Sequence, residues 1–445
     1  MHSVTYKAYS TSPIWMHFGA QGVTIHVVFV DLEKNMPEFR SITGFTSIHA
    51  HDYAGDLDRI GAFLNIASTA FEDAGISVQS KRLGTQPFSQ FGVSPADLPE
   101  TVKSIRVHAN HVGIDYLSIG AVGIQDDPGF IDALADVFSA SAFTFGSVKI
   151  AEREHGGIHL PLLRRMATLI DRVSRITSDG FSNLFLAGLA NCPPHSPFFP
   201  VAYHDGGEPA FALAIQAADL PNTVFANVTD PTDAKNLLTD AINHYTAQII
   251  PTAEGLAREY AMRFVGIDFS LAPYPVDEKS LGGAMEKLGP AFGGFGLIAA
   301  ASIIMNAVEA ADFPSAGFSG LMLPVLEDNI LGERVSEGRL TINDLLLLST
   351  ICGTGLDCIP LAGDIGTENL YAILLDVAAL ALRLDKPLTA RLMPFPGKKP
   401  GDKLSFDFEY FGDSRVMPTP AYVIRKDAAL GSEQGQLDIS PRRRS

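Results

Sequence analysis

Residues 263–273 place two reactive polar side chains at the end of an apolar run. Side chains of a β-strand alternate between its two faces, so Asp268 and Ser270 would lie on the same face. Prolines at positions 273 and 275 then end the strand. A carboxylate and a hydroxyl at a strand end can bind a ligand or transfer protons, as they do at the mouths of α/β sites. The alternative is an ordinary strand end whose polar side chains cap a turn.

Four further acids lie near the ends of expected elements in the C-terminal half. Glu327 and Asp328 follow an apolar run, and Asp357 and Asp364 follow a pair of close glycines. Such carboxylates can hold a divalent cation or act as general acid and base. For Glu327 and Asp328 the alternative is that acids in the first turn of a helix merely complement the helix dipole.

Cys352 is a candidate nucleophile in an unfavourable expected position. A helix from about Thr341, with Asp344 completing a possible capping box, would end at Gly353. The negative end of the helix dipole then opposes formation of the thiolate. Cys352 would therefore need a nearby cation in order to react.

A histidine and two acids form another group, namely His204, Asp205 and Glu208, shortly after Asn191. Imidazole and carboxylate groups are acid–base catalysts and metal ligands. The alternative is a hairpin with a solvated histidine, because the Asp-Gly-Gly sequence at 205–207 is a strong turn signal.

Alternating strands and helices have to position these residues. Apolar stripes with helical spacing run through 57–71, 163–173 and 370–384. The alternation implies an α/β fold with a mainly parallel sheet. No long linker divides residues 20–415, which favours one domain. Ten strand-like runs are expected: Val23–Asp31, Arg40–His49, Ile76–Leu83, Gly113–Gly120, Ala142–Ile150, Asn183–Asn191, Ala210–Ala217, Arg263–Leu271, Phe318–Val325 and Leu404–Phe411.

Composition excludes several classes of partner. The 445 residues carry a formal net charge of −17, which repels nucleic acids and anionic membranes. Three cysteines without zinc spacing indicate a reducing compartment, and with no secretory signal visible we expect a cytoplasmic protein. No nucleotide or flavin motif is present; the sequence leaves the cofactor open, and a divalent metal is one candidate. The expected partner is a small-molecule ligand, and a homo-oligomer is compatible with the composition.

Three long blocks resemble one known family: 266–273 (GIDFSLAP), 317–328 (GFSGLMLPVLED) and 349–364 (STICGTGLDCIPLAGD). They are similar to the uncharacterised family called domain of unknown function 711, which resembles pyruvate formate-lyase in fold. The resemblance implies a single ten-stranded α/β barrel over residues 21–425. A divergent extension at 1–20 and a disordered polar tail at 426–445 would flank it. The glycyl-radical motif is absent, so radical chemistry is not expected.

Because the resemblance supplies no reaction, two hypotheses stay open. In the first, the chain is an enzyme that performs hydrolase, lyase or isomerase chemistry on a small polar metabolite. In the second, the same cavity binds a metabolite for regulation without turnover. Under the first hypothesis, Asp268 and Asp357 are general acid and base, and Glu327, Asp328 and Asp364 hold a cation. Arg40 pairs with a substrate carboxylate. His204 and Glu208 bind substrate at the mouth of the site, and Asn191 is a further substrate-binding residue.

Overall fold

The computed structural model describes residues 38–49, 52–420 and 424–441, and within them twelve strands form one large sheet. Nine strands follow each other in the order β10-β11-β7-β5-β4-β3-β1-β8-β9, and β2, β6 and β14 attach to this path. Most neighbours pair in parallel, whereas β8 pairs antiparallel with β1, and β11 with β7. The strands are β1 (Glu38–Thr46), β2 (Ser77–Val78), β3 (Lys81–Thr85), β4 (Tyr116–Val122), β5 (Thr144–Glu152), β6 (Gly157–His159), β7 (Leu186–Ala190), β8 (Ala210–Gln216), β9 (Arg263–Asp268), β10 (Gly355–Ala362), β11 (Leu388–Phe395) and β14 (Gln436–Leu437). A separate hairpin pairs β12 (Lys403–Leu404) with β13 (Ser414–Arg415).

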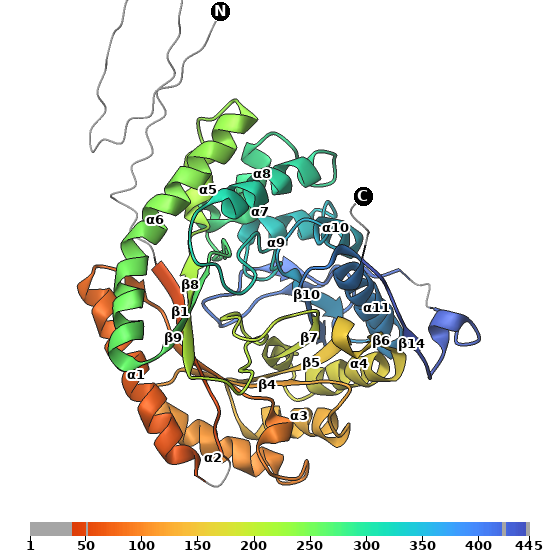
Figure 1. Cartoon of the computed structure of the whole chain (residues 1–445). Coiled ribbons are helices and arrows are strands. Elements are labelled where there is room, and N and C mark those ends of the chain that lie inside the picture. Colours follow the sequence, from red (N-terminus) through yellow and green to blue (C-terminus); the bar gives the residue numbers. More distant parts are fainter. Residues whose placement is uncertain (1–37, 50–51, 421–423, 442–445) are drawn as a thin grey trace, which may run out of the picture.

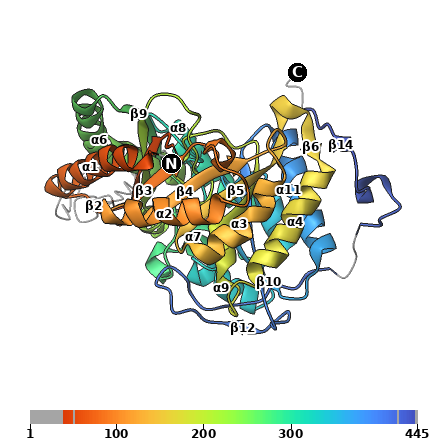
Figure 2. The same cartoon turned by 90° about the horizontal axis from the view of Figure 1, so that it is seen from below.

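Helices cover the outside of this sheet. In Figure 1, α1 to α4 follow one another around the strands, and Figure 2 shows α2, α3 and α4 side by side across one face. The helices are α1 (Tyr53–Asp73), α2 (Leu98–His111), α3 (Gly129–Ala140), α4 (Leu160–Ser174), α5 (Asp219–Phe225), α6 (Pro231–Tyr260), α7 (Leu281–Lys287), α8 (Leu297–Ala310), α9 (Asn329–Ser336), α10 (Ile342–Leu348) and α11 (Thr367–Leu384). Short 3₁₀ turns occur at Phe88–Gln90, Arg153–His155, Phe181–Phe185, Asp277–Lys279 and Ala429–Gly431. Among the described residues, none of these helices has both the length and the apolar character needed to cross a bilayer.

The apolar stripes predict the buried helix faces correctly. Leu57, Ile60, Leu64 and Phe71 of α1 are buried against the sheet, and the stripe of α4 is buried as well. In α11 most of the stripe is buried, but Ile373 and Leu380 are half-buried and Leu384 is exposed. A helix with one apolar face gains its stability from this burial, at about 25 cal/mol for each Å² removed from water. The mixed α/β class and the largely parallel sheet are therefore confirmed.

A closed barrel is not detected in the described part of the chain. The sheet ends at β9 on one side and β10 on the other. Residues 315–325 run between these two edges and were expected to contain a strand at Phe318–Val325. Their strand pairing with the β9 side is limited to the isolated bridges Ile267–Ser315 and Leu271–Leu321. On the β10 side, the Val325 amide donates to the Asp357 carbonyl at 3.3 Å.

Three further expectations need correction, and two fall outside the described residues. The run Leu404–Phe411 contributes only the end of β12, and the tail expected to be disordered forms β14, which pairs with β6. Conversely, the stretch around Asp357, expected to be a loop, is the buried strand β10. The extension at 1–20 and the run Val23–Asp31 lie outside the described residues.

Candidate functional site

A buried network of ion pairs lies where β1, β10 and β11 meet the segment before α9. Arg40 Nη2 lies 2.5 Å from one oxygen of Glu327, and Arg391 Nη2 lies 3.1 Å from the other. Arg391 Nε also donates to Asp357 Oδ1 at 2.6 Å. Glu327, Asp357 and Arg391 are each at most 5% exposed. Two arginines and two carboxylates thus balance one another in the interior, as buried charges must.

Two irregularities in the sheet direct these side chains. The pairing of β1 with β8 shifts register between Phe39 and Ser41, so Arg40 lies at a bulge. The pairing of β10 with β11 shifts between Leu356 and Ile359, which places Asp357 in a second bulge. A bulge interrupts the strict alternation of side chains and re-aims the extra residue. Residues from distant strands are in this way turned toward Glu327.

Burial and the neighbouring charges shift the pKa values of Glu327 and Asp357 in opposite directions. Burial by itself would raise the pKa of Glu327, but Arg40 and Arg391 outweigh burial, and the pKa is lowered. Burial dominates at Asp357 and raises its pKa, although Arg391 opposes the shift. Glu327 is therefore the firmly ionised partner of both arginines.

Next to this network is a cavity of about 80 Å³. Arg40, Glu327 and Arg391 line it, and so do Asp268 and Ser270. The rest of the lining is mainly aromatic and includes Tyr116, Phe143, Phe145, Phe198, Phe199, Phe408 and Tyr410. The cavity combines an apolar wall with a few charged groups, which is the usual make-up of a small-molecule site.

Arg82 also lines the cavity, and it forms no ion pair with a described carboxylate, although Glu327 attracts its charge weakly. Its Nε donates to Ser80 Oγ at 2.9 Å, and its guanidinium carbon lies 5.1 Å from the Tyr116 ring centroid and 5.4 Å from that of Phe199. Burial, together with the nearby charge of Arg40, lowers the pKa of Arg82 to about 10. An arginine this poorly compensated favours a negatively charged partner.

Asp268, which also lines the cavity, accepts hydrogen bonds from Ser270 and from residues 318–319. One oxygen accepts from the Ser270 amide at 3.0 Å, the Ser270 hydroxyl and the Ser319 amide at 2.9 Å. The other accepts from the Phe318 amide at 3.1 Å. Burial raises the pKa of Asp268, even though these four donors oppose the shift. Asp268 therefore both fastens the segment after β9 and faces the cavity.

The remaining expected site residues lie elsewhere. Cys352 is fully buried, and neither it nor Asn191, His204 or Glu208 lines the cavity. Glu208 and Asp364 are exposed. Asp328 is buried, but both of its oxygens bind the first turns of α7 and α9. The structure thus does not bring Asp328 and Asp364 to Glu327 as ligands of one cation, because one caps helices and the other faces water.

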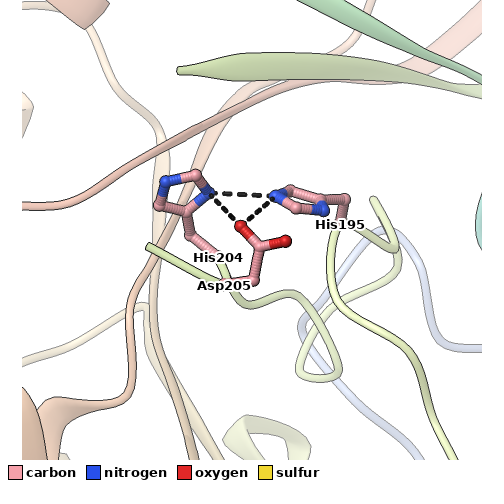
Figure 3. Close-up of side chains that lie close together, drawn as sticks. All are labelled: His195, His204 and Asp205. Atoms are coloured by element: carbon pink, nitrogen blue, oxygen red, sulfur yellow. Dashed lines mark hydrogen bonds and ion pairs between the residues drawn. The ribbon is translucent and has the colours of Figure 1, made fainter. Parts of the chain in front are cut away.

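Arg40 differs from its expected role as well. It lines the cavity, but its guanidinium pairs with Glu327, so its charge is already balanced. His204 instead meets His195 and Asp205 in a separate cluster, shown in Figure 3.

Comparison with known proteins places the chain in a family. The family described as "Uncharacterised ACR (DUF711)" matches residues 32–411. The chain belongs to this family. Every residue that lines the cavity of this DUF711 member, from Arg40 to Tyr410, falls inside the matched segment.

Several relatives are similar over much of their length. A UPF0210 protein of Pyrobaculum arsenaticum is 33% identical over 61% of this chain and 61% of its own. A UPF0210 protein of Pyrobaculum aerophilum is 30% identical over 74% of this chain and 76% of its own. A third, from Oleidesulfovibrio alaskensis, is 28% identical over 91% of each chain. These names state no activity, so the site of this DUF711 chain has to be interpreted from its geometry.

Sequence reasoning missed Arg82, Arg391 and Tyr410 as site residues. Arg391 carried a usable signal, since it is the one charge in the apolar run Leu388–Phe395. A charge inside a buried strand needs a partner, so it marks a polar network. Arg82 carried no comparable signal, because an arginine in a half-polar strand is an ordinary surface pattern. The same holds for Tyr410, because a tyrosine in a loop is equally ordinary.

Proposed function

We propose that this chain is an enzyme that binds a small anionic molecule in the cavity beside Arg82 and acts on it by acid–base chemistry. The observation that carries the proposal is the unbalanced guanidinium of Arg82. Arg40 and Arg391 have carboxylate partners, whereas Arg82 has only Ser80, a backbone carbonyl and two aromatic rings among the described residues. A carboxylate or phosphate group would complete the charge balance and could bind the guanidinium through two hydrogen bonds.

The size of the cavity limits the ligand. A space of about 80 Å³ accommodates on the order of five water-sized groups. Its aromatic walls, among them Phe198 and Phe199, favour a short apolar portion next to the anionic group. The ligand class is thus a phosphate-sized anion or a short-chain carboxylate.

Asp268 is the proposed proton-transfer group. It lines the cavity, and burial raises its pKa toward the range in which a carboxyl group can both give and take a proton. Ser270, hydrogen-bonded to it, can relay or orient that proton. Such chemistry fits hydrolase, lyase or isomerase reactions and needs no nucleotide or flavin.

A second function, ligand binding without turnover, is favoured by one specific observation. Four donors already bind the two oxygens of Asp268. A carboxylate engaged in this way can serve purely to hold residues 316–319 against β9. In that case the cavity would be the ligand-binding site of a regulatory protein.

The charge distribution disfavours a metal beside Glu327. Glu327, Asp357 and Cys358 offer ligand atoms within 4.8 Å of one another. However, Arg40 and Arg391 already pair with both oxygens of Glu327 and with Oδ1 of Asp357, and Cys358 donates its proton to Glu327 at 3.3 Å. A cation would have to enter next to two guanidinium groups, so we propose catalysis without a metal at this position.

A closed ten-stranded barrel of the pyruvate formate-lyase type also belongs to the proposal. It is supported by residues 315–325, whose isolated bridges and hydrogen bonds span the gap between β9 and β10. A crystal structure with ligand would test it, since a continuous ladder through this segment would close the barrel and an open gap would exclude it.

Binding is tested by calorimetry with phosphate, sulfate and short-chain mono- and dicarboxylates. At least one anion should bind, and Arg82→Gln should weaken that binding at least about tenfold, the equivalent of one charged hydrogen bond. Arg165→Gln is the matched control, because Arg165 pairs with Asp132 on the surface. Equal affinity in wild type and Arg82→Gln would refute the anion site.

Turnover is tested separately with Asp268→Asn, after confirming that the variant folds. The bound anion and a metabolite pool are incubated with wild type and variant, and products are followed by mass spectrometry. Loss of turnover with binding retained supports the enzyme. A bound anion that no form of the protein converts supports the regulatory function instead.

A further inference from the structure

Two buried histidines and one half-exposed aspartate converge outside the cavity. His195 Nε2 lies 2.9 Å from His204 Nδ1 and 3.4 Å from Asp205 Oδ1, and His204 Nδ1 lies 3.8 Å from that same oxygen. Figure 3 shows the three polar atoms pointing toward one another. His195 and His204 are 4% and 0% exposed, whereas the Asp205 side chain is 47% exposed.

The three separations match those of ligands around one small ion. Ligand atoms about 2.1 Å from a tetrahedral zinc ion must be about 3.4 Å apart. The observed separations of 2.9, 3.4 and 3.8 Å bracket this value. Two imidazoles and one carboxylate are also the donor set that divalent transition metals prefer.

The backbone of Gly207 orients two of the three side chains. Its carbonyl faces His204 Nε2 at 3.1 Å, and its amide donates to Asp205 Oδ1 at 3.0 Å. Since a carbonyl can only accept, His204 carries its proton on Nε2, and Nδ1 presents a lone pair. Outer contacts of this kind orient ligands in metal sites.

His195 is held in place at a conformational cost. Its backbone has φ of 65°, a left-handed conformation that residues with side chains rarely adopt. A hydrogen bond from its amide to the Tyr203 carbonyl, 2.8 Å long, secures it. Strain of this kind concentrates at functional positions.

We propose that His195 Nε2, His204 Nδ1 and Asp205 Oδ1 form a binding site for one divalent transition-metal ion, Zn²⁺ foremost. The exposed side of Asp205 leaves the fourth position open to solvent. This site does not depend on the function proposed for the Arg82 cavity, since none of its three ligands lines that cavity.

The guanidinium of Arg263 contacts His195 and would compete with a bound metal ion. Its Nη2 lies 3.2 Å from both ring nitrogens of His195. When Nε2 binds a metal, the proton of the neutral ring moves to Nδ1, where a guanidinium has no acceptor to offer. Arg263 must then turn away, which its exposed position at the start of β9 permits.

The first test measures metal binding by the metal-free full-length protein. Zn²⁺ should bind with a stoichiometry of one, and Co²⁺ should give the intense visible absorption of tetrahedral coordination. Asp205→Asn, at a half-exposed position that leaves the core intact, should weaken binding at least about tenfold. Glu208→Gln is the matched control, an exposed acid three residues away that should change nothing. No binding by wild type, or equal binding by wild type and Asp205→Asn, overturns the site.

The second test is a gain of affinity, which misfolding cannot imitate. Arg263→Gln removes the competing charge and supplies an oxygen that can accept the Nδ1 proton of His195. Zn²⁺ affinity should therefore rise several-fold in this variant. An unchanged or lower affinity contradicts the arrangement, because it would mean that Arg263 and the metal do not compete.

Discussion

Glu327 and Asp328 are adjacent in the chain and both buried, yet their carboxylates serve separate parts of the molecule. Glu327 binds Arg40 and Arg391 beside the cavity. Asp328 accepts from the Ser280 hydroxyl at 2.5 Å and from the Leu281 amide at 2.8 Å, joining the start of α7 to the start of α9. The two acids therefore have separable effects on charge balance and on helix docking.

Glu327→Gln should destabilise the protein by about 3–5 kcal/mol, since it leaves two buried arginines without their shared partner. Urea denaturation gives the free energy of unfolding. Glu337→Gln is the control, because Glu337 makes its ion pairs with Arg334 and Arg339 on the surface and should cost under about 1 kcal/mol. Similar losses in both variants would contradict the importance of the buried network.

The contribution of Glu327 should also depend on pH. Burial opposes ionisation, but Arg40 and Arg391 outweigh it, so the folded-state pKa lies below the ordinary value of 4.5. A lowered folded-state pKa stabilises the fold above the unfolded value, and this stability is lost as pH falls through the folded value. The difference in unfolding free energy between wild type and Glu327→Gln should thus stay constant from neutral pH down to the ordinary value of 4.5 and shrink as the pH falls below it. A difference that also stays constant below that value would show that ionisation of Glu327 is not its source.

Asp328→Ala should cost more than removal of an ordinary helix cap. Asp328 accepts four hydrogen bonds and is 1% exposed, so we expect a loss of about 2–4 kcal/mol. Asp230 caps α6 through two amides at the surface, and Asp230→Ala should cost about 1 kcal/mol. Thermal denaturation of both variants compares them directly, and equal shifts would argue against the role of Asp328 in joining two helices.

Gly317→Ala should disturb Asp268 and weaken anion binding in the cavity. Gly317 has φ of 60°, and an added Cβ would lie 2.0 Å from Asp268 Oδ2. Gly338 shares the positive φ, at 72°, but has open space around it. Gly338→Ala should therefore show only the strain of a left-handed residue, about 1–2 kcal/mol. Calorimetric titration with whichever of the tested anions binds the wild type compares them, and full affinity in Gly317→Ala would show that the cavity tolerates movement of Asp268.

The strands that were found from sequence have a simple pattern, and those that were missed do not. The runs that became β1 and β5 are rich in β-branched and aromatic residues, and their predicted bounds overlap the observed ones. In contrast, β10 contains Gly355, Asp357 and Pro360, which are typical of loops. Proline is tolerated there because β10 lies at the end of the sheet order, where it needs no ladder on its outer side.

The candidate site was foreseen only in part. Asp268, Ser270, Glu327 and Arg40 do line one cavity. Asp357 does not line the cavity itself and joins the network through its hydrogen bond with Arg391. Local sequence cannot reveal that Asp328 turns to α7, because its partners at Ser280 and Leu281 are 48 and 47 residues away. Local sequence likewise cannot reveal that the Asp364 side chain is exposed to solvent whereas that of Glu327 is buried.

By itself, the sequence determined the α/β class, the apolar faces of the helices and the polar strand end at Asp268 and Ser270. These features depend on local periodicity and on the cost of burying polar groups. Only the tertiary structure decided which charges pair, because ion pairs such as Arg40–Glu327 join residues 287 positions apart. That pairing, set by two bulges and by the order of the strands, leaves Arg82 without an ion pair among the described residues.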